Sequence, residues 1–428
     1  MLNTLLIIFG KLLSRFAKAF NLGHGSTWPG HIALKVNPDF IKDLLQNTNT
    51  KIVLVAGTNG KTTTSLMLKS ILKESGKSVL HNASGANLRN GIASYLLLNT
   101  NRSGKITQDF AIFESDENTL PHLLNDISPT FLVVLNLFRD QLDRYGEVTL
   151  IAKKWEEAFE KLGKKTTLIL NADDPLVASL GKNSKAQKLF FGITVDYESN
   201  ITDFAVDSVQ CYVCGEKLLY TKTFFSHLGI WHCPGCKLER PKPSLEEFRH
   251  YPLDGMYNKY NTHAAVLTAQ KLSVDTQTII NAFKEFEPAF GRQEVIRYNG
   301  KRIQIFLSKN PTGFNESLKT ICDKNAKHVM LLLNDRIPDG KDVSWIWDVG
   351  FEDTIQNFPH ITVSGDRVYD LTLRLKYAEE DDISFFESLK NALSNAVSKL
   401  SKDETLYILA TYSAMLEARK LLTGKKIL

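Results

Sequence analysis

The stretch from Val53 to Thr64, VLVAGTNGKTTT, combines the residue types that hold a nucleoside triphosphate. Apolar residues lead into a glycine-containing turn, and a lysine and threonines open a helical pattern. In such a strand–turn–helix unit, backbone N–H groups and the helix dipole face the phosphates. Lys61 can reach the β- and γ-phosphate oxygens, and the Thr62 hydroxyl can ligate Mg²⁺. The sequence therefore predicts an ATP site formed by Gly57, Thr58, Asn59, Gly60, Lys61, Thr62 and Thr63.

Acidic side chains follow several apolar runs, where an α/β nucleotide site commonly uses them. Mg²⁺ beside phosphate oxygens needs few carboxylates from the protein. A single acid in such a place also fits a helix cap or an exposed turn, and the residues alone leave that alternative open. The acids of this kind are Glu114, Asp140, Asp143, Asp173 and Asp174.

Four of the five cysteines form the pattern C-x₂-C-x₁₈-C-x₂-C. Two such pairs present four thiolates to one ion, which suits tetrahedral Zn²⁺, and a closed shell of four is structural rather than catalytic. This spacing predicts a zinc ribbon in a protein of a reducing compartment. The alternative interpretation is that the ribbon only stabilises an inserted segment and has no other function. The fifth cysteine, Cys322, fits a buried apolar position. The predicted zinc ligands are Cys211, Cys214, Cys233 and Cys236.

Apolar runs alternate with helical patterns along most of the chain, which predicts an α/β fold with parallel sheets covered on both faces. We expect an N-terminal amphipathic segment and linker over residues 1–45 and a central ATP-binding domain over 46–294, with the ribbon inserted at about 205–242. A C-terminal Rossmann-like α/β domain follows over 295–428. The expected strands are KIVLVAG, DFAIFES, TFLVVLN, TTLILNAD, RIQIFLS, HVMLLLN, HITVSG and TLYILAT.

The first twenty residues, MLNTLLIIFGKLLSRFAKAF, have the pattern of a basic amphipathic helix. Their apolar run is too short to span a bilayer, and no small-residue cleavage site follows, so a signal peptide is not expected. Such a helix either packs on the body of the protein or touches the inner face of the membrane. The net charge of +5 over 428 residues gives no case for a nucleic-acid partner.

The loop GTNGKTTT resembles the ATP loop of the Mur ligases and folylpolyglutamate synthases, whose shorter motif accounts for Val55 where the common phosphate loop has glycine. Further segments resemble that superfamily in the same chain order: NLFRDQLDRYGE, NADDP, LDGMYNKYNTHAA and FGRQE. The resemblance implies a Mur ligase-type central domain. It also implies nucleotide or substrate contacts through Asn171, Asp173, Asn258, Asn261 and Arg292.

Several features depart from the ordinary Mur pattern. Gln141 and Tyr257 replace histidines, LSKNPTGFN replaces a conserved motif of the third domain, and a UDP-sugar-binding domain is not expected in the roughly fifty residues before the loop. Together with the ribbon, the segments GSTWPGHIAL, LNDRIPDGKDVSWIWDVGFE, SGDRVYDLTLRLKYA and LATYSAMLEAR resemble the MurT family, the ligase subunits of lipid II isoglutaminyl synthase. This resemblance runs over essentially the whole chain.

The resemblance implies ATP-dependent amidation of the α-carboxylate of D-glutamate in the lipid II stem peptide, through an acyl phosphate. Lys61 would clamp the γ-phosphate, while Thr62 and Glu114, with Glu117 in reserve, would bind Mg²⁺. The chain has no glutaminase signature, so ammonia would come from a GatD-like glutamine amidotransferase subunit, docked mainly on the C-terminal domain. Asp348, in SWIWDV, would orient a partner histidine or deprotonate ammonium. The enzyme would be cytoplasmic, at the inner membrane face.

Two other interpretations stay open. The chain could be another amide-forming ligase of the superfamily, such as a folylpolyglutamate synthase-like enzyme with an amino acid as nucleophile. It could also be a zinc-ribbon ATPase without ligase activity.

Overall fold

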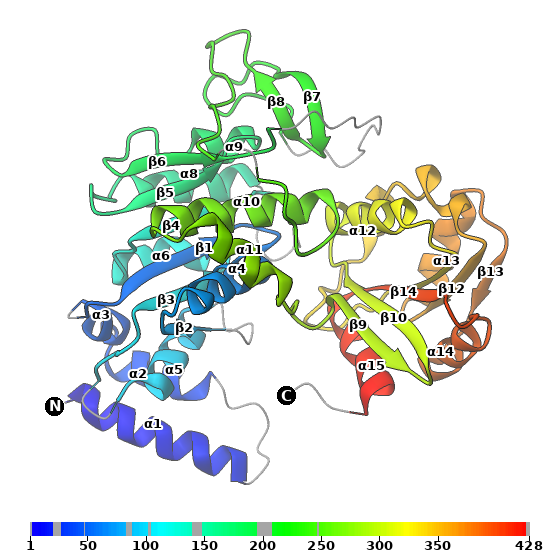
Figure 1. The fold of residues 1–428 in the computed structure, drawn as a ribbon, viewed down its shortest axis with the longest axis horizontal. Helices are drawn as coiled ribbons and strands as arrows, with labels where there is room; N and C mark the ends of the chain where they lie inside the picture. The colour runs from blue at the N-terminus through cyan, green and yellow to red at the C-terminus, as the bar shows by residue number, and fades with distance from the viewer. Residues whose placement is uncertain are drawn as a thin grey trace.

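The computed structural model describes residues 2–19, 27–46, 48–82, 88–101, 104–138, 148–194, 208–245 and 248–424. Within them, two six-stranded sheets form the cores of two lobes, and a two-stranded hairpin projects from the first lobe (Figure 1). The predicted α/β class is confirmed. Asp140, Gln141 and Asp143 lie outside the described residues.

The first sheet is parallel throughout and has the strand order β2–β3–β1–β4–β5–β6. The chain winds from β1 towards β2 on one side, and after β3 it crosses to β4 on the other side. The carboxyl end of β1 therefore lies where the winding reverses, which is where open α/β sheets bind ligands. The strands are β1 (Lys51–Ala56), β2 (Val79–His81), β3 (Phe110–Ser115), β4 (Phe131–Val134), β5 (Thr167–Asn171) and β6 (Gln187–Phe191).

The sequence predicts β1, β3, β4 and β5 of this sheet but neither of its edge strands. β2 has three residues, too few for a recognisable pattern. β6 has the sequence QKLFF, in which only the last residue is fully buried. Edge strands carry a weak apolar signal because neighbours cover them less completely.

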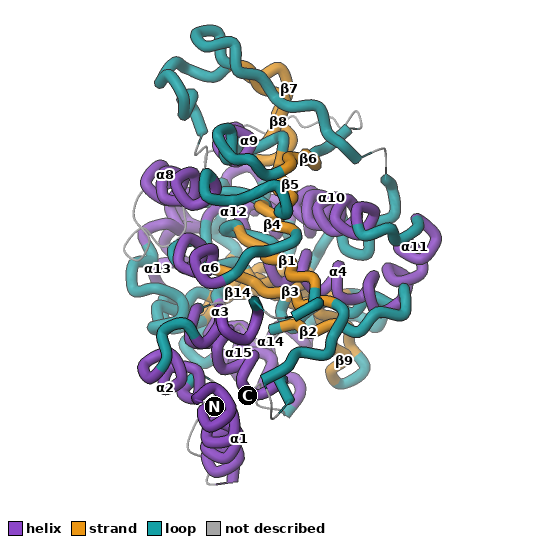
Figure 2. Tube along the Cα trace, turned by 90° about the vertical axis from the view of Figure 1, so that its left-hand side faces the viewer, coloured by secondary structure: helices purple, strands orange, loops and turns teal. Residues whose placement is uncertain are grey.

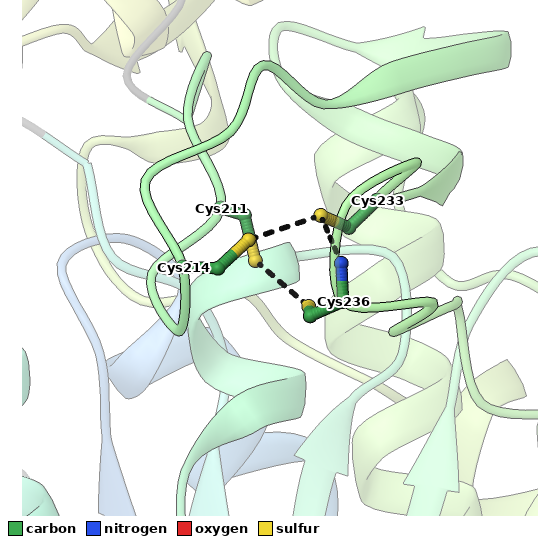
Figure 3. Close-up of side chains that lie close together, drawn as sticks. All are labelled: Cys211, Cys214, Cys233 and Cys236. Atoms are coloured by element: carbon green, nitrogen blue, oxygen red, sulfur yellow. Dashed lines mark hydrogen bonds between the residues drawn. The ribbon is translucent and has the colours of Figure 1, made fainter.

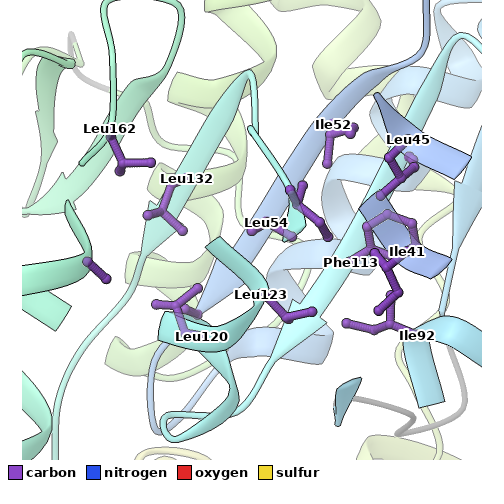
Figure 4. Packing of buried hydrophobic residues seen from close by; sticks show 14 of the residues in the cluster. Ile41, Leu45, Ile52, Leu54, Ile92, Phe113, Leu120, Leu123, Leu132 and Leu162 are labelled. Carbon is purple, nitrogen blue, oxygen red and sulfur yellow. The ribbon is translucent and has the colours of Figure 1, made fainter. Parts of the chain in front are cut away.

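Helices cover both faces of this sheet (Figure 2). Ile52 and Leu54 of β1 face one core and Val53 and Val55 the other, since side chains alternate along a strand. Figure 4 shows the first core, where each buried side chain contributes roughly 1.5–3 kcal/mol. Besides the N-terminal helix, the helices of this core are α2 (Trp28–Val36), α3 (Phe40–Leu45), α5 (Arg89–Asn99), α6 (Thr119–Asp126), α8 (Val148–Phe159) and α9 (Pro175–Ser179). Those of the other are α4 (Lys61–Glu74), α10 (Met256–Lys271) and α11 (Thr276–Lys284).

The predicted N-terminal helix is present as α1 (Leu2–Ala19), which lies on α2 and α5. Leu6 and Ile7 are buried in the first core, and Gly10 lets the helix approach Leu97 closely. The segment expected as a linker contains α2 and α3, whose buried side chains pack in the same core. In the part of the chain that the structure describes, no helix has the length and apolar character needed to cross a membrane.

The inserted ribbon consists of β7 (Leu219–Phe225) and β8 (Leu228–His232), which pair antiparallel, with a cysteine loop on either side. It lies at the top of Figure 1, and β7 contacts α10 of the first lobe. The ribbon is therefore attached to the layer of helices that covers the phosphate loop.

The second sheet has the order β13–β12–β11–β14–β10–β9, with β9 antiparallel to β10 and the other pairs parallel. The sequence predicts neither β9, which carries three charged side chains, nor the three-residue β13. Its strands are β9 (Arg292–Tyr298), β10 (Lys301–Leu307), β11 (His328–Leu332), β12 (His360–Ser364), β13 (Ile383–Phe385) and β14 (Thr405–Ala410). The helices are α12 (Pro311–Asp323), η1 (Ser344–Asp348), η2 (Phe351–Asp353), η3 (Ile355–Asn357), α13 (Val368–Tyr377), α14 (Leu389–Ser398) and α15 (Tyr412–Thr423).

Candidate active site

The predicted phosphate loop joins β1 to α4 at the point where the winding of the first sheet reverses. Gly57 has a φ of 137° and Gly60 a φ of 90°, which L side chains rarely adopt. A Cβ on Gly60 would also collide with the side-chain amide of Asn261 on α10. The turn thus requires glycine at both positions, and it places the N-terminus of α4 at the carboxyl edge of the sheet, a favourable place for phosphate.

The segment after β4 fixes this loop. The Asn59 backbone N–H donates to Asn136 Oδ1 at 2.9 Å, and Asn136 Nδ2 donates back to the Asn59 carbonyl at 3.1 Å. The Phe138 N–H donates to the Thr58 hydroxyl at 3.1 Å. Lys61 Nζ donates to the Gly57 and Thr58 carbonyls. The loop is consequently held in one conformation before any phosphate arrives.

Glu114, at the end of β3, is buried beside the first turn of α4. Thr62 Oγ1 donates to Glu114 Oε2 at 2.7 Å, and Ser65 Oγ donates to Glu114 Oε1 at 2.8 Å. His81 Nε2 lies 3.0 Å from Ser65 Oγ and 3.7 Å from Glu114 Oε1. The strand pairing Val55↔Glu114 explains this proximity, because it sets the carboxylate next to the start of the loop.

This carboxylate is ionised at neutral pH. Burial raises the pKa of Glu114, but hydrogen bonds from His81 and Thr62 and the charge of Arg292 outweigh burial, so the pKa lies below its ordinary value. Mg²⁺ prefers hard oxygen ligands and takes few from the protein when phosphates supply the rest. The Thr62 hydroxyl and the Glu114 carboxylate fit such a site.

A pocket lies between the phosphate loop and the second lobe. Asn310, the N-cap of α12, donates from Nδ2 to Asn59 Oδ1 at 3.3 Å, so the second lobe touches the loop itself. Glu316 and Ser317 of α12 form the opposite wall. Of the residues predicted to contact nucleotide or substrate, the pocket lining includes Asn59, Gly60, Thr63, Asn258, Asn261 and Arg292.

The polar side chains that line this pocket include a buried cation and a buried phenol, Arg292 and Tyr257. Burial lowers the pKa of Arg292, and the charge of Glu114 opposes that shift. Arg292 makes no salt bridge with any residue in the described ranges, so this desolvated cation suits a phosphate or carboxylate group of a ligand. Burial raises the pKa of Tyr257 to about 12, and its hydroxyl accepts from Gln293 Nε2 at 2.9 Å. A neutral phenol thus occupies the position where the Mur pattern has histidine.

Asn171 and Asp173 do not line this pocket. Asn171 Nδ2 donates to the Leu135 carbonyl at 2.9 Å. Arg240 Nε donates to Asp173 Oδ1 at 2.6 Å and the Tyr260 hydroxyl to Asp173 Oδ2 at 2.8 Å. In this structure both side chains make hydrogen bonds within the first lobe and its ribbon. Asp173 connects Arg240, at the end of the ribbon, to Tyr260 of α10.

The four ribbon cysteines converge at the outer end of the hairpin (Figure 3). Their Sγ atoms all lie within 4.8 Å of one another. The Sγ atoms of Cys211 and Cys236 are 3.6 Å apart and those of Cys214 and Cys233 3.4 Å. A tetrahedral ion with Zn–S bonds of about 2.3 Å requires sulfurs at close to this spacing. The cluster is therefore compatible with zinc.

Asp348 lies apart from the pocket. It ends η1, is exposed, and does not belong to the pocket lining. Beside it begins a row of exposed apolar side chains along α13, in which Trp347 packs edge-on against Tyr377 with ring centroids 5.3 Å apart. We call this row the α13 patch; it consists of Trp347, Tyr369, Leu373, Tyr377 and Phe385.

Sequence patterns miss Ser65, His81 and Asn136 as site residues. Each is an ordinary polar residue that reaches the loop or Glu114 only through the strand order of the sheet. Asn310 had one local signal, since an asparagine before proline favours a helix N-cap. That pattern does not predict the hydrogen bond of Asn310 to Asn59, which lies 251 positions earlier in the chain.

The comparisons with known families cover most of the chain. Residues 55–269 match the Mur ligase middle domain, and residues 307–415 match the MurT ligase C-terminal family. The lipid II isoglutaminyl synthase (glutamine-hydrolyzing) subunit MurT of Streptococcus pneumoniae is 34% identical over 95% of this chain and 94% of its own length. The subunit of the same name from Staphylococcus aureus is 34% identical over 83% of each chain.

Solved structures share the fold at lower identity. A pseudomurein peptide ligase type C from Methanothermus fervidus aligns with a TM-score of 0.69 and 24% identity, over 90% of this chain and 81% of that one. MurF from Acinetobacter baumannii aligns with a TM-score of 0.64 and 20% identity, over 90% and 78% of the respective chains. These likenesses support the arrangement of two α/β lobes.

Proposed function

The chain belongs to the MurT family of Mur-type ligases, and on that basis we propose that it is the ATP-using subunit of a lipid II isoglutaminyl synthase. In this proposal it converts the α-carboxylate of D-glutamate in the lipid II stem peptide to the carboxamide of D-isoglutamine. One observation carries the proposal: Thr62 and the buried Glu114 meet at the N-terminus of α4, beside a pocket between the lobes. This arrangement suits phosphoryl transfer to a carboxylate.

The reaction has two balanced steps. A carboxylate oxygen of the substrate attacks the γ-phosphorus of ATP, the bond from that phosphorus to the bridging oxygen breaks, and ADP leaves. Ammonia then attacks the acyl carbon, inorganic phosphate leaves with the electrons of the C–O bond, and the nitrogen gives up a proton. Activation is needed because a free carboxylate is a poor acyl donor.

The residues of the loop stabilise the charge that moves in the first step. Lys61 can turn from the loop carbonyls towards the γ-phosphate, where its ammonium offsets the developing negative charge. Thr62 and Glu114 would hold Mg²⁺, which when bound neutralises charge on the phosphates. Asn258 and Arg292 would orient a phosphate or the substrate carboxylate from the pocket wall. The ribbon cysteines would hold Zn²⁺ in a structural role.

Ammonia would come from a partner subunit, because ammonium has no lone pair with which to attack. We propose that a GatD-like glutamine amidotransferase subunit docks on the second lobe, over the α13 patch. The support is an exposed aromatic surface, typical of the anchors at protein interfaces, next to the exposed Asp348. Asp348 would then orient a histidine of the partner or take a proton from ammonium.

Turnover measurements test the proposal. The chain is assayed for ADP release with lipid II and with glutamine, glutamate or ammonia as nitrogen source, in the presence and absence of the glutaminase subunit. We expect ADP release and carboxamide formation together, with glutamine effective only when the partner is present. Release of ADP with glutamate but not ammonia would instead identify an amino-acid ligase of the folylpolyglutamate synthase type. ATP hydrolysis without any amide product would identify an ATPase.

We also propose that α1 contacts the cytoplasmic face of the membrane, where a lipid-linked substrate is held. Its outer face exposes an apolar stripe at helical spacing, whereas Leu6 and Ile7 anchor the other face in the protein. Arg15 supplies positive charge for anionic lipids. The stripe consists of Leu2, Leu5, Phe9, Leu12 and Phe16.

Substitution within the stripe tests this contact without removing the buried anchor. The triple change Leu5→Ser, Phe9→Ser, Leu12→Ser should abolish co-sedimentation with vesicles rich in anionic lipid, because it removes most of the apolar area available for insertion. Leu150→Ser changes an exposed leucine on α8 and serves as the control. Equal binding of the triple variant and the unaltered protein would refute the membrane contact.

A further inference from the structure

The tip of the ribbon hairpin enters the core of the first lobe. Phe224, Phe225 and Leu228 are buried in the same cluster as Val53 and Val55 of β1, directly beneath the phosphate loop. The hairpin turns through Ser226, with a φ of 48°, and His227, which is fully buried. A ribbon that only stabilised an inserted segment would not need to pack against β1, the strand that leads into the phosphate loop.

Phe225 is part of the nucleotide pocket itself. It is 5% exposed and belongs to the pocket lining together with Asn59 and Gly60 of the loop. Its ring lies 5.4 Å from that of Phe138, whose backbone holds the Thr58 hydroxyl. The hairpin tip thus touches both the pocket and the support of the phosphate loop.

His227 carries polar groups that no described residue satisfies. Both ring nitrogens are buried without a hydrogen-bond partner, with Nε2 3.4 Å from Asp174 Oδ2 and the ring 4.7 Å from Phe138. Buried polar groups normally find partners, and sites that leave them open are commonly completed by a ligand or water. Among the described residues, the polar side of the tip thus lies against the Asp174 carboxylate.

The rest of the hairpin links this tip rigidly to the cysteine cluster. Trp231 Nε1 donates to the Ala172 carbonyl at 3.0 Å, and the Gly229 N–H donates to the Asp173 carbonyl at 2.9 Å. Cys233 follows β8 directly, and Trp231 packs with Cys211 and Cys233 in one small core. The position of the tip thus depends both on these bonds to the first lobe and on the cysteine cluster, which lies one short strand away.

We propose that the hairpin tip, chiefly Phe225, forms the wall of the pocket that receives the adenine base, so that an intact cysteine cluster supports nucleotide binding. The proposal rests on the use of ATP proposed above. The loop residues fix the phosphate end of the nucleotide, so the base extends into the remaining pocket, whose other walls include Leu253, Tyr257 and Phe306. An aromatic ring among apolar side chains suits a flat purine.

Binding of a non-hydrolysable ATP analogue to the full chain tests the role of Phe225. Phe225→Ala should weaken binding roughly 5- to 150-fold, the usual range for the loss of one base–aromatic contact. Phe225→Tyr should bind almost as the unaltered protein does, and Ile230→Ala, on the outer face of β8, should have no effect. Inorganic tripolyphosphate should bind all of these equally, because it has no base.

Unchanged affinity of Phe225→Ala for the ATP analogue would overturn the proposal. An equal loss for tripolyphosphate would overturn it too, since the damage would then lie in the loop. Thermal unfolding and zinc content of each variant separate a folding defect from a binding defect. None of these measurements requires lipid II or a partner, so failure of the amidation assay leaves them interpretable.

Removal of metal tests the link to the cysteine cluster. Chelation should weaken analogue binding by the unaltered protein by a factor similar to Phe225→Ala, and should weaken binding by Phe225→Ala little further, because both changes act on the same wall. Tripolyphosphate binding should persist. If the metal-free protein binds the analogue as tightly as before, the cluster does not support the pocket.

Discussion

Glu114→Gln should lower kcat for ATP-dependent amidation about 10²–10³-fold, the typical loss when one charge-stabilising group is removed from a transition state. Glutamine has almost the same size; its Oε1 can accept from one of the Thr62 and Ser65 hydroxyls and its Nε2 can donate to the other, so the fold should persist. Loss of the negative charge should also raise the Mg²⁺ concentration needed for half-maximal rate. Initial rates measured across a Mg²⁺ series, with ADP release and carboxamide formation followed together, check both effects.

Glu157→Gln, an exposed change on α8, is the matched control and should behave as the unaltered protein. Because the pKa of Glu114 lies below its ordinary value, its carboxylate stays ionised throughout the neutral range, and its contribution to stability is lost only as the pH falls through that lowered pKa. A variant whose kcat and Mg²⁺ requirement both match the control would remove Glu114 from the metal site.

Asp348→Asn should abolish most amidation with glutamine, roughly 10²-fold or more, the usual size of a general acid–base contribution. The same variant should retain activity with ammonium salts at a pH above the pKa of ammonium. The reason is that Asp348 is exposed and outside the nucleotide pocket, so its proposed role concerns the supply of ammonia rather than phosphoryl transfer. The measurement is the ratio of glutamine-driven to ammonia-driven rates with the partner present.

Asp353→Asn, in the neighbouring η2, provides the control because it removes a similar exposed charge from the same region. Binding of the partner by each variant is measured separately, so that lost docking is not mistaken for lost chemistry. If Asp348→Asn loses ammonia-driven activity as completely as glutamine-driven activity, Asp348 acts in the ligase reaction itself and the proposed role is wrong.

Local motifs predicted those parts of the site that depend on neighbouring residues. The phosphate loop needs only a strand, two glycines and a helix, and the cysteine pairs need only their spacing. The strand order then brings Glu114 to Thr62. The sequence named Glu114 as one of five acids after apolar runs, and only the family resemblance singled it out as a Mg²⁺ ligand. The buried central strands could also be predicted locally, because both of their faces are apolar and each strand is therefore a continuous apolar run.

Contacts between distant segments were not predictable in this way. Asn310 meets Asn59 only because the second lobe closes on the loop. Phe225 belongs to an aromatic stretch of the ribbon, and its sequence neighbours give no sign that it reaches the nucleotide pocket. The motif that contains Asn171 and Asp173 implied nucleotide contacts. In the structure, both side chains make hydrogen bonds to other residues of the same chain.

The central claim is that ATP activates the substrate carboxylate as an acyl phosphate, and isotope transfer tests it most directly. Lipid II labelled with ¹⁸O in the α-carboxylate of D-glutamate is converted with ATP, glutamine and the partner subunit, and the released phosphate is analysed by mass spectrometry. If the carboxylate is activated in this way, one ¹⁸O atom should appear in inorganic phosphate for each carboxamide formed, with ADP as the other product. Unlabelled phosphate, or AMP and pyrophosphate in place of ADP, would contradict the central claim.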